Sequence, residues 1–385
     1  MKNSVISIID HFSSLEDPRV VGRSSHLLID IITITLCSVI SGAESWYDVQ
    51  LYGELKKDFL KRFLLLPHGI PSHDTFSRVL SIIDPASIKQ CFVSWVQDAL
   101  GSSGKMIAID GKTARRSYDK KKRKGPLHMI SAWATDMGLV LGQQSCDEKS
   151  NEITAIPELL RVLDLEGSIV TIDAMGCQKK IAEQIIRQKG DYVFSLKGNQ
   201  GATHQDVKRS FNQARKKRWR GFKYNRYETK ETGHGRIEKR RYWTMERTPD
   251  RFGFIWRREP WAGADTIGMV ESERTIDGKT SKETRYYISS LGNNAKAFAH
   301  AVRGHWGIEN SLHWVLDVVF KEDENRTRAG HAQENLAIIR HIALNLIKQE
   351  KTKKGSIKGR RKCAGWDNNY LLTILGVKGA KGACF

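Results

Sequence analysis

Two aspartates in this sequence end apolar runs, and basic residues follow each of them. Asp110 closes the run KMIAID (105–110), and Asp173 closes the run SIVTID (168–173). In sheets with helices between parallel strands, chemistry sits at the carboxyl ends of the strands. If the two runs are neighbouring parallel strands, both carboxylates project into one crevice. The alternative is that each aspartate only forms the turn that follows its strand.

A pair of close carboxylates repel each other, and a divalent cation relieves the repulsion. Mg²⁺ uses one or two carboxylates, keeps several waters and takes further oxygen ligands from phosphates. Two such ions can activate an attacking oxygen and stabilise a leaving oxygen at a phosphodiester. The two aspartates therefore predict a Mg²⁺ site, in which Mn²⁺ can substitute, that acts on a phosphate backbone.

A third acid is expected in the stretch 303–328. Read as a helix, this stretch places His305, Glu309 and His313 on one stripe, four residues apart. We expect Glu309 to complete the site. Two alternatives are a structural helix in which Glu309 pairs with Arg303, and a zinc site made of the three residues of the stripe.

The composition indicates which partner this chemistry would serve. The chain has 63 Lys and Arg against 43 Asp and Glu, a net charge of +20, and 40% hydrophobic residues. A folded protein this basic usually meets nucleic acid. Phosphate contacts are expected from basic residues close to the two aspartates and near the end of a later strand: Lys112, Arg115, Arg116 and Lys197.

The cysteines and the apolar segments place the chain in the cytoplasm. The six cysteines are scattered and form no Cys-x-x-Cys pair, so neither a structural zinc site nor a disulfide framework is expected. The apolar stretch 27–40 is only about half a membrane span and contains Asp30, which favours a buried helix. We expect no membrane association.

The pattern along the chain predicts an α/β fold. Residues 1–97 are expected to form a helical domain for DNA binding or assembly. Residues 104–201 show the order β-β-β-α-β-α-β, which predicts a mixed sheet with helices packed on it. With a helical segment, 293–348, this region would form the catalytic core. Residues 202–292 would be a basic, β-rich insertion, and 349–385 a basic tail.

Two further stretches outside the core carry specific expectations. The motif IDGKT occurs at 109–113 and again at 276–280. In the second copy, Asp277-Gly278 stands between strand-like arms and predicts a hairpin turn, not a site. The basic run 351–362 in the tail is expected to be mobile.

Several longer motifs carry a resemblance to a known family. The chain resembles the DDE transposases of bacterial insertion sequences, most closely the H-repeat-associated branch found beside Rhs elements. The matching stretches cover most of residues 105–345 in family order: IAIDGKTARRS, HMISAWATDMGLVLGQ, KSNEITAIPELL, IVTIDAMGCQKKIA, DYVFSLKGNQ and HWGIENSLHWVLDVVFKEDENRTR. The N-terminal stretches FSSLEDPR and GIPSHDTFSRVL are similar to the associated domain of that branch.

The resemblance implies a ribonuclease H-like core that cuts and joins double-stranded DNA with bound metal. It implies a triad in which Asp110 and Asp173 are the two aspartates and Glu309 is the glutamate. Its DNA partners would be the terminal repeats of the element and a target, and two chains would pair the two ends as a homodimer.

The sequence departs from the family pattern around the glutamate. The wider family often carries a tyrosine, an arginine and a lysine at the positions occupied here by Val302, His305 and Leu316. His305 or Arg303 is then expected to take over phosphate contact. Two nearby acids remain alternatives for the third ligand: Asp317 and Asp323.

Two rival functions share these features. A nuclease or junction resolvase could use the same fold, because fold alone does not define function. A catalytically inactive transposase remnant could bind the ends of an element without cutting them. The presence of all three acids favours an active transposase.

Overall fold

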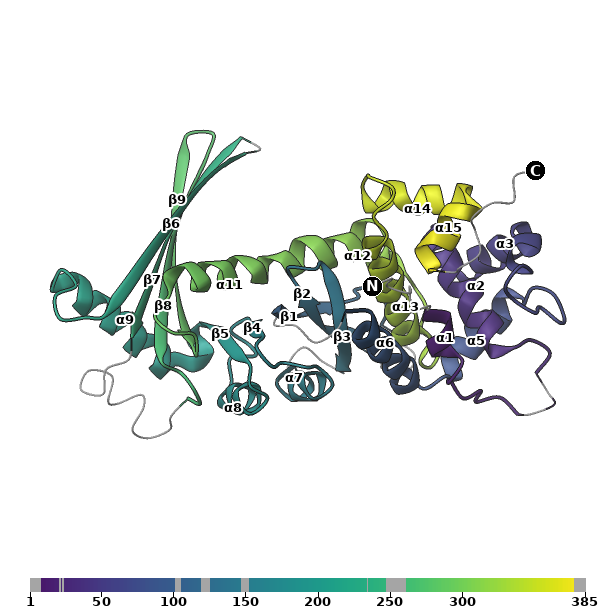
Figure 1. Ribbon diagram of the computed structural model, residues 1–385, viewed down its shortest axis with the longest axis horizontal. Helices are drawn as coiled ribbons and strands as arrows, with labels where there is room; N and C mark the ends of the chain where they lie inside the picture. The colour runs from purple at the N-terminus through teal and green to yellow at the C-terminus, as the bar shows by residue number, and fades with distance from the viewer. Residues whose placement is uncertain are drawn as a thin grey trace, which may run out of the picture.

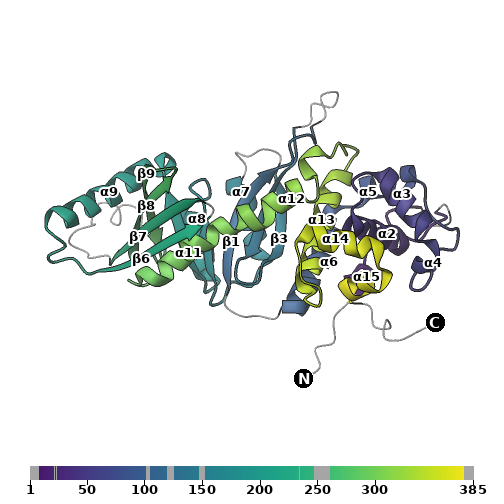
Figure 2. The same cartoon turned by 90° about the horizontal axis from the view of Figure 1, so that it is seen from above.

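The computed structural model describes residues 8–20, 22, 24–100, 105–118, 125–146, 152–233, 235–246 and 261–376. Within these residues the molecule is elongated, with a helical bundle at one end, a mixed sheet in the middle and a ribbon of long strands at the other end (Figure 1). One long helix, α11 (Ala295–Ile308), runs from the ribbon toward the bundle and crosses the sheet (Figure 2). The chain is an α/β protein, as predicted.

Five strands form the centre of the sheet, and their order along the chain confirms the predicted β-β-β-α-β-α-β pattern. They lie side by side as β3-β2-β1-β4-β5. The neighbours β1, β4 and β5 are parallel, whereas β2 is antiparallel to β1 and to β3. The bounds are β1 Met106–Thr113, β2 His128–Ala134, β3 Leu139–Cys146, β4 Ile169–Ile172 and β5 Asp191–Leu196.

Helices cover both faces of this central sheet. On one face lie α7 (Glu152–Arg161) and α8 (Lys179–Arg187), and α11 crosses the other (Figure 1). In α8 the apolar residues fall on one stripe that is buried: Ile181, Ala182 and Ile185. Because both faces are covered, β2 is buried along its whole length.

Four longer strands continue the same sheet beyond β5 and form the ribbon. β9 pairs antiparallel with β5, and β8, β7 and β6 follow in order. The predicted hairpin is confirmed, because Ile276 pairs with Lys279 and both turn residues have positive φ, 47° at Asp277 and 75° at Gly278. The helix before the ribbon is α9 (Gly201–Lys216), and the strands are β6 Tyr224–Gly233, β7 Arg236–Glu246, β8 Thr266–Ile276 and β9 Lys279–Ser289.

The helical bundle combines both ends of the described chain. The long helix α13 packs against α2 and α5, and α14 packs against α2. The N-terminal helices are α1 Ile8–Phe12, α2 Leu28–Ser41, α3 Trp46–Leu55, α4 Lys57–Leu60, α5 His73–Ile82 and α6 Pro85–Leu100. The later helices are α12 Trp314–Val318, α13 Ala332–Gln349, α14 Ile357–Trp366 and α15 Asn368–Leu375.

The expectation of a mobile basic run at 351–362 is wrong for its second half. This half forms most of α14, and two of its arginines are buried. Arg360 donates to Glu350 and to the Tyr370 hydroxyl, and Arg361 donates to the carbonyls of Val319 and Val39. Composition indicated a solvated run because it could not show these acceptors, which come from distant parts of the chain. Residues 377–385 lie outside the described residues.

The apolar stretch near the N-terminus is α2, a buried helix as predicted. Asp30 is buried within it and accepts a hydrogen bond from the Leu66 N–H at 3.0 Å. Among the described helices, none is by itself long and apolar enough to cross a membrane, although α2 and α3 together, bent by 96°, meet that test by length and composition.

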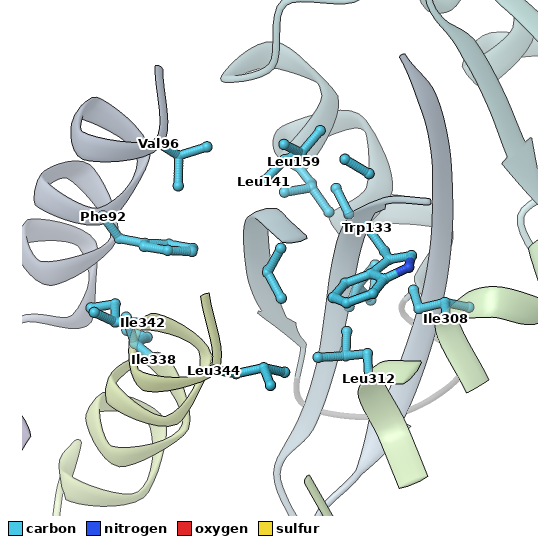
Figure 3. Close-up of a cluster of buried hydrophobic side chains, with 14 of the residues drawn as sticks. Phe92, Val96, Trp133, Leu141, Leu159, Ile308, Leu312, Ile338, Ile342 and Leu344 are labelled. Atoms are coloured by element: carbon cyan, nitrogen blue, oxygen red, sulfur yellow. The ribbon is translucent and has the colours of Figure 1, made fainter. Parts of the chain in front are cut away.

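A continuous apolar core joins the sheet to the bundle. Trp133 of β2 lies in the middle, with Phe92 of α6 and Ile342 of α13 on the bundle side (Figure 3). Ile308 and Leu312, which flank Glu309 in sequence, lie beside the same tryptophan (Figure 3). The core therefore fixes the helix end that carries the predicted third acid.

Candidate functional site

The strand register places the two predicted aspartates side by side. Ile109 of β1 pairs with Ile172 of β4 in a parallel ladder, and Asp110 and Asp173 are the next residues on each chain segment. Both aspartates line one pocket of about 180 Å³. The prediction that the two apolar runs are neighbouring parallel strands is confirmed.

Each aspartate also makes the local contacts of the alternative interpretation. Asp110 Oδ1 accepts a hydrogen bond from the Gly111 N–H at 3.0 Å, and Asp173 Oδ1 accepts one from the Met175 N–H at 2.9 Å. These bonds use one oxygen of each carboxylate. Turn formation and a place in the pocket are therefore compatible.

Glu309 lines the same pocket and comes from α11, on the far side of the sequence. The helix can approach β1 closely because residue 304 is glycine. A Cβ at Gly304 would meet the side chain of Met106, and the Gly304 carbonyl accepts a hydrogen bond from the Thr135 hydroxyl at 3.1 Å. The small residue thus brings the end of α11 within reach of the strand that carries Asp110.

The helix widens where it carries the acid. Residues Glu309–His313 form a π-helical turn, a feature often found at functional sites. Ile308 and Leu312 are fully buried, whereas Glu309 between them is exposed. The apolar neighbours hold the turn against the core, and Glu309 is left on the pocket side.

The three acids interact electrostatically. Burial raises the pKa of Asp110 to about 7, and the charge of Asp173 adds to this, followed by those of Glu309 and Glu152; the Gly111 N–H acts in the opposite direction. A carboxyl group that resists ionisation at this position is a mark of a functional site. What it lacks is a compensating positive charge.

The residues of the pocket fit a hard divalent cation by type. The acids supply only oxygen donors, and Asp110 shows the repulsion that a cation would relieve. As the side chains stand, however, no three His, Cys, Asp or Glu residues of the described chain form a group that could hold a metal ion. Ion binding would therefore require the acids to turn toward one another within the pocket.

The stripe proposed as a zinc alternative is divided by the π-helical turn. His305 lines the pocket, and its Nδ1 lies 3.1 Å from the Thr171 hydroxyl. His313 instead contacts Asp110, with 3.6 Å between Nδ1 and Oδ2, and burial lowers its pKa to about 3. Because the described residues contain no group able to hold a metal ion, the zinc interpretation gains no support.

The predicted pairing of Glu309 with Arg303 is wrong. Arg303 points to the ribbon, where its Nη2 lies 2.8 Å from Glu231 Oε1 of β6. Glu309 is thus not accounted for by that structural role. Arg303 lines a groove along the ribbon, where its predicted phosphate contact stays a prediction.

Lys112 lies outside the pocket. Its side chain is only 9% exposed, and its ammonium contacts three carboxylates: Asp317 at 2.7 Å, Glu322 at 2.8 Å and Asp323 at 3.3 Å. This placement argues against the predicted phosphate contact of Lys112. It also engages Asp317 and Asp323 away from the pocket, so the structure favours neither as the third acid.

The other basic residues predicted near the site remain accessible. Lys197 is exposed and lines the pocket. Arg115 and Arg116 are exposed after β1, and Arg115 pairs with Asp323 through its Nε at 3.3 Å. Phosphate contact by these three residues stays a prediction.

Sequence reasoning missed the wall that the ribbon contributes to the pocket. Glu283, Arg285 and Tyr287 alternate along β9, so they share one face of the strand, and all three line the pocket. The Arg285 guanidinium lies 4.8 Å from the ring centre of Trp306, which is 39% exposed. The period-two spacing was visible in the sequence, but nothing there showed which face of β9 meets the site.

A second groove, of about 510 Å³, continues from the pocket along the ribbon. The two share five lining residues: Glu283, Arg285, Tyr287, Val302 and Trp306. Six cationic side chains and three carboxylates line the groove: Arg236, Arg240, Arg274, Lys282, Arg285 and Arg303, with Glu238, Glu273 and Glu283. The path that leads to the three acids is therefore positively charged.

Comparisons with known proteins agree with this geometry. The chain is 44% identical over 377 residues to the "H repeat-associated putative transposase YhhI" of Escherichia coli K12, covering 97% of this chain and 98% of the relative. It is 42% identical to the "Putative transposase YncI" of Escherichia coli O157:H7, covering 97% and 95%. A short relative, the "Inactive transposase YbfQ" of strain K12, is 45% identical over 74 residues, covering 19% of this chain and 88% of the relative.

One solved structure also aligns with the fold. The piggyBac transposase synaptic complex with hairpin DNA aligns over 98% of this chain and 80% of the other, at 10% identity and a TM-score of 0.43. No conclusion is drawn from a likeness at this level.

Two family models match the chain. A model described as "DDE_Tnp_1-associated" matches residues 9–96, and the model of the transposase DDE domain matches residues 76–346. The latter match spans most of the sequence and includes all three pocket acids. Together with the relatives of nearly equal length, it shows that this chain belongs to the transposase DDE domain family.

Proposed function

We propose that this chain is an active transposase that cuts DNA at the ends of a mobile element and joins the freed 3′ ends to target DNA. Asp110, Asp173 and Glu309 would be the metal-holding carboxylates. The supporting observation is that these acids, far apart in sequence, line one pocket in which burial and mutual repulsion raise the pKa of Asp110 to about 7.

Each pocket residue has a defined task under this proposal. A bound Mg²⁺ or Mn²⁺ would supply the charge that activates the attacking oxygen and stabilises the leaving oxygen. Asp110 and Asp173, from neighbouring strands, hold one side of that site, and Glu309 holds the other. Lys197 and Arg285 on the pocket wall carry the positive charge that would orient the scissile phosphate.

The groove along the ribbon would hold the DNA next to the cut. Its cations outnumber its carboxylates, and it opens directly into the pocket. Contacts of this kind set the register of the backbone without reading its sequence. Binding would consequently weaken as salt concentration rises.

The remaining assignments are also proposals. The central sheet with α7, α8 and α11 would be a ribonuclease H-like core formed by 104–201 and 293–348, with 202–292 inserted and 349–385 as a C-terminal segment. The helical region 1–97 would recognise element ends or support assembly. Two chains would pair the two ends of an element, in the bacterial cytoplasm.

The decisive experiment compares Asp173→Asn with the wild-type chain on DNA that carries the ends of the element. In Mg²⁺ or Mn²⁺ the wild type should nick the end, and the variant should lose cleavage while it still binds the DNA. Asp58→Asn is a matched control, because the Asp58 side chain is 99% exposed on α4. An Asp173 variant that cuts as well as the wild type would refute the assignment of the metal site.

A strand-transfer assay separates the rival functions. Covalent joining of pre-cut element ends to a plasmid supports transposition. Cleavage without joining would indicate a nuclease or resolvase, and binding without either reaction would indicate an inactive remnant.

A further inference from the structure

Lys112 occupies a buried ionic cluster directly behind the first aspartate. It lies two residues after Asp110 on β1, and its ammonium contacts Asp317, Glu322 and Asp323. An ammonium has three N–H donors, so three carboxylates can satisfy it fully. Nothing remains of this side chain for a substrate phosphate.

All three carboxylates come from the segment that follows Glu309. Asp317 lies on α12, two helical turns after Glu309, and the other two belong to the 3-10 turn Glu322–Glu324. Arg115 strengthens the same link, because its N–H donates to Asp323 Oδ1 at 3.2 Å. The strand of the first acid is thus tied to the segment after the third acid across 211 residues of sequence.

The cluster is also tied to the bundle. Arg340 of α13 is buried, and its Nη1 lies 3.7 Å from Glu322 Oε1. Counting Arg115, three cations face three carboxylates, so the charges balance. Removal of one partner from a buried, balanced cluster leaves an uncompensated charge, which strongly favours rearrangement.

We infer that Lys112 is a positioning residue that sets the location of Glu309 relative to Asp110. The inference rests on the proposed function, because it assumes that these two acids act together. Ile308 and Leu312 anchor one side of the π-helical turn in the core, and Lys112 anchors the helix beyond it through Asp317. Without the second anchor, α12 can shift, and Glu309 moves with it.

The test is Lys112→Met, which keeps the length of the side chain and removes its charge. A displacement of about 1 Å at a catalytic group can cost about 10²-fold in rate. We expect cleavage of element-end DNA to fall by about that factor, with DNA affinity and its salt dependence unchanged. A loss of affinity with a shallower salt dependence would instead identify a phosphate contact and overturn the inference.

Direct binding of Mn²⁺ to the DNA-free protein provides a readout other than activity. We expect Lys112→Met to weaken Mn²⁺ binding about tenfold or more, in line with other residues that orient metal ligands. Lys89→Met is the matched control, because Lys89 is also mostly buried and pairs with Glu334 at 3.0 Å far from the pocket. Equal Mn²⁺ binding by the Lys112 and Lys89 variants would reduce the role of Lys112 to general stability and overturn the inference.

Two further measurements keep the inference open to refutation. If Lys112→Met does not fold, Asp323→Asn removes one contact of the three and should show a smaller loss of Mn²⁺ affinity; unchanged affinity would count against the inference. Asp173→Asn is assayed in parallel. If it cuts DNA like the wild type, the proposed function itself fails; if it is inactive while Lys112→Met cuts and binds Mn²⁺ normally, only the positioning role fails.

Discussion

Two groups of charged side chains meet on strand β1, and they treat charge in opposite ways. In the pocket, Asp110 faces Asp173 and Glu309, and its pKa is raised to about 7. Around Lys112 the charges balance, and the opposite shift occurs. Burial acts to raise the pKa of Glu322, but the charges of Lys112 and Arg340 bring it down to about 2.

The difference distinguishes a group built to stay as it is from one built to accept a partner. Balanced buried charges hold elements in one geometry, and breaking them is costly. An acid whose ionisation is opposed by its surroundings is instead typical of a functional site. The two groups share a strand, so each can be altered while the other serves as the reference.

The largest effect is expected from the pocket group. Glu309→Gln keeps the shape of the side chain and removes its charge. We expect the rate of DNA cleavage to fall about 10³-fold or more, which corresponds to about 4 kcal/mol of activation free energy. Glu324→Gln, an exposed acid on the nearby 3-10 turn, should cut at the wild-type rate. Wild-type cleavage by the Glu309 variant would move the third ligand to another acid.

The balanced cluster should affect stability instead. Glu322→Gln leaves Lys112 and Arg340 without a buried partner, and we expect a loss of about 3–5 kcal/mol in the free energy of unfolding at pH 7. Because the folded pKa of Glu322 is depressed, its contribution is present above the ordinary glutamate pKa and is lost as pH falls toward 2. Urea denaturation should therefore show the difference from wild type shrinking between pH 6 and pH 3. A constant difference over that range would contradict the assignment.

Removal of the repelled charge should stabilise the metal-free protein. Because the folded pKa of Asp110 is raised, its ionisation opposes folding progressively as pH rises from about 4 through about 7. Asp110→Asn should thus melt a few °C above the wild type at pH 8, with a smaller difference at pH 5. Added Mn²⁺ should raise the melting temperature of the wild type but not that of the variant. A variant that melts below the wild type at pH 8 would show that repulsion does not dominate at this residue.

The parts of this site that follow local patterns could be predicted from the sequence. Apolar runs that end in Asp110 and Asp173 identified two strands, and the alternation of strands and helices after them implied that the two are parallel neighbours. The turn at Asp277-Gly278 was readable because its backbone conformation favours those residue types. These features depend on neighbours along the chain.

The parts that depend on distant partners could not be predicted. Lys112 looked like a free cation beside the site, because its three carboxylates lie more than 200 residues away in sequence. The widening of the helix at Glu309 has no signature in the spacing of apolar residues. The contribution of Arg285 required knowledge of which face of β9 meets α11. Charge alone does not show whether a basic residue meets a phosphate or a buried acid.

The smallest effect is expected from the groove, where a single cation is one of several. Arg274→Gln removes a half-exposed side chain that lies 3.4 Å from Glu238 on the groove wall. If it contacts a phosphate, the slope of log affinity against log salt should decrease by about one, with no change in the cleavage rate at saturating DNA. Arg209→Gln on α9, also exposed but outside the groove, should leave the slope unchanged. Equal slopes for both variants would mean that DNA approaches the acids by another route, since a backbone lying in the groove must lose one counterion-releasing contact with Arg274.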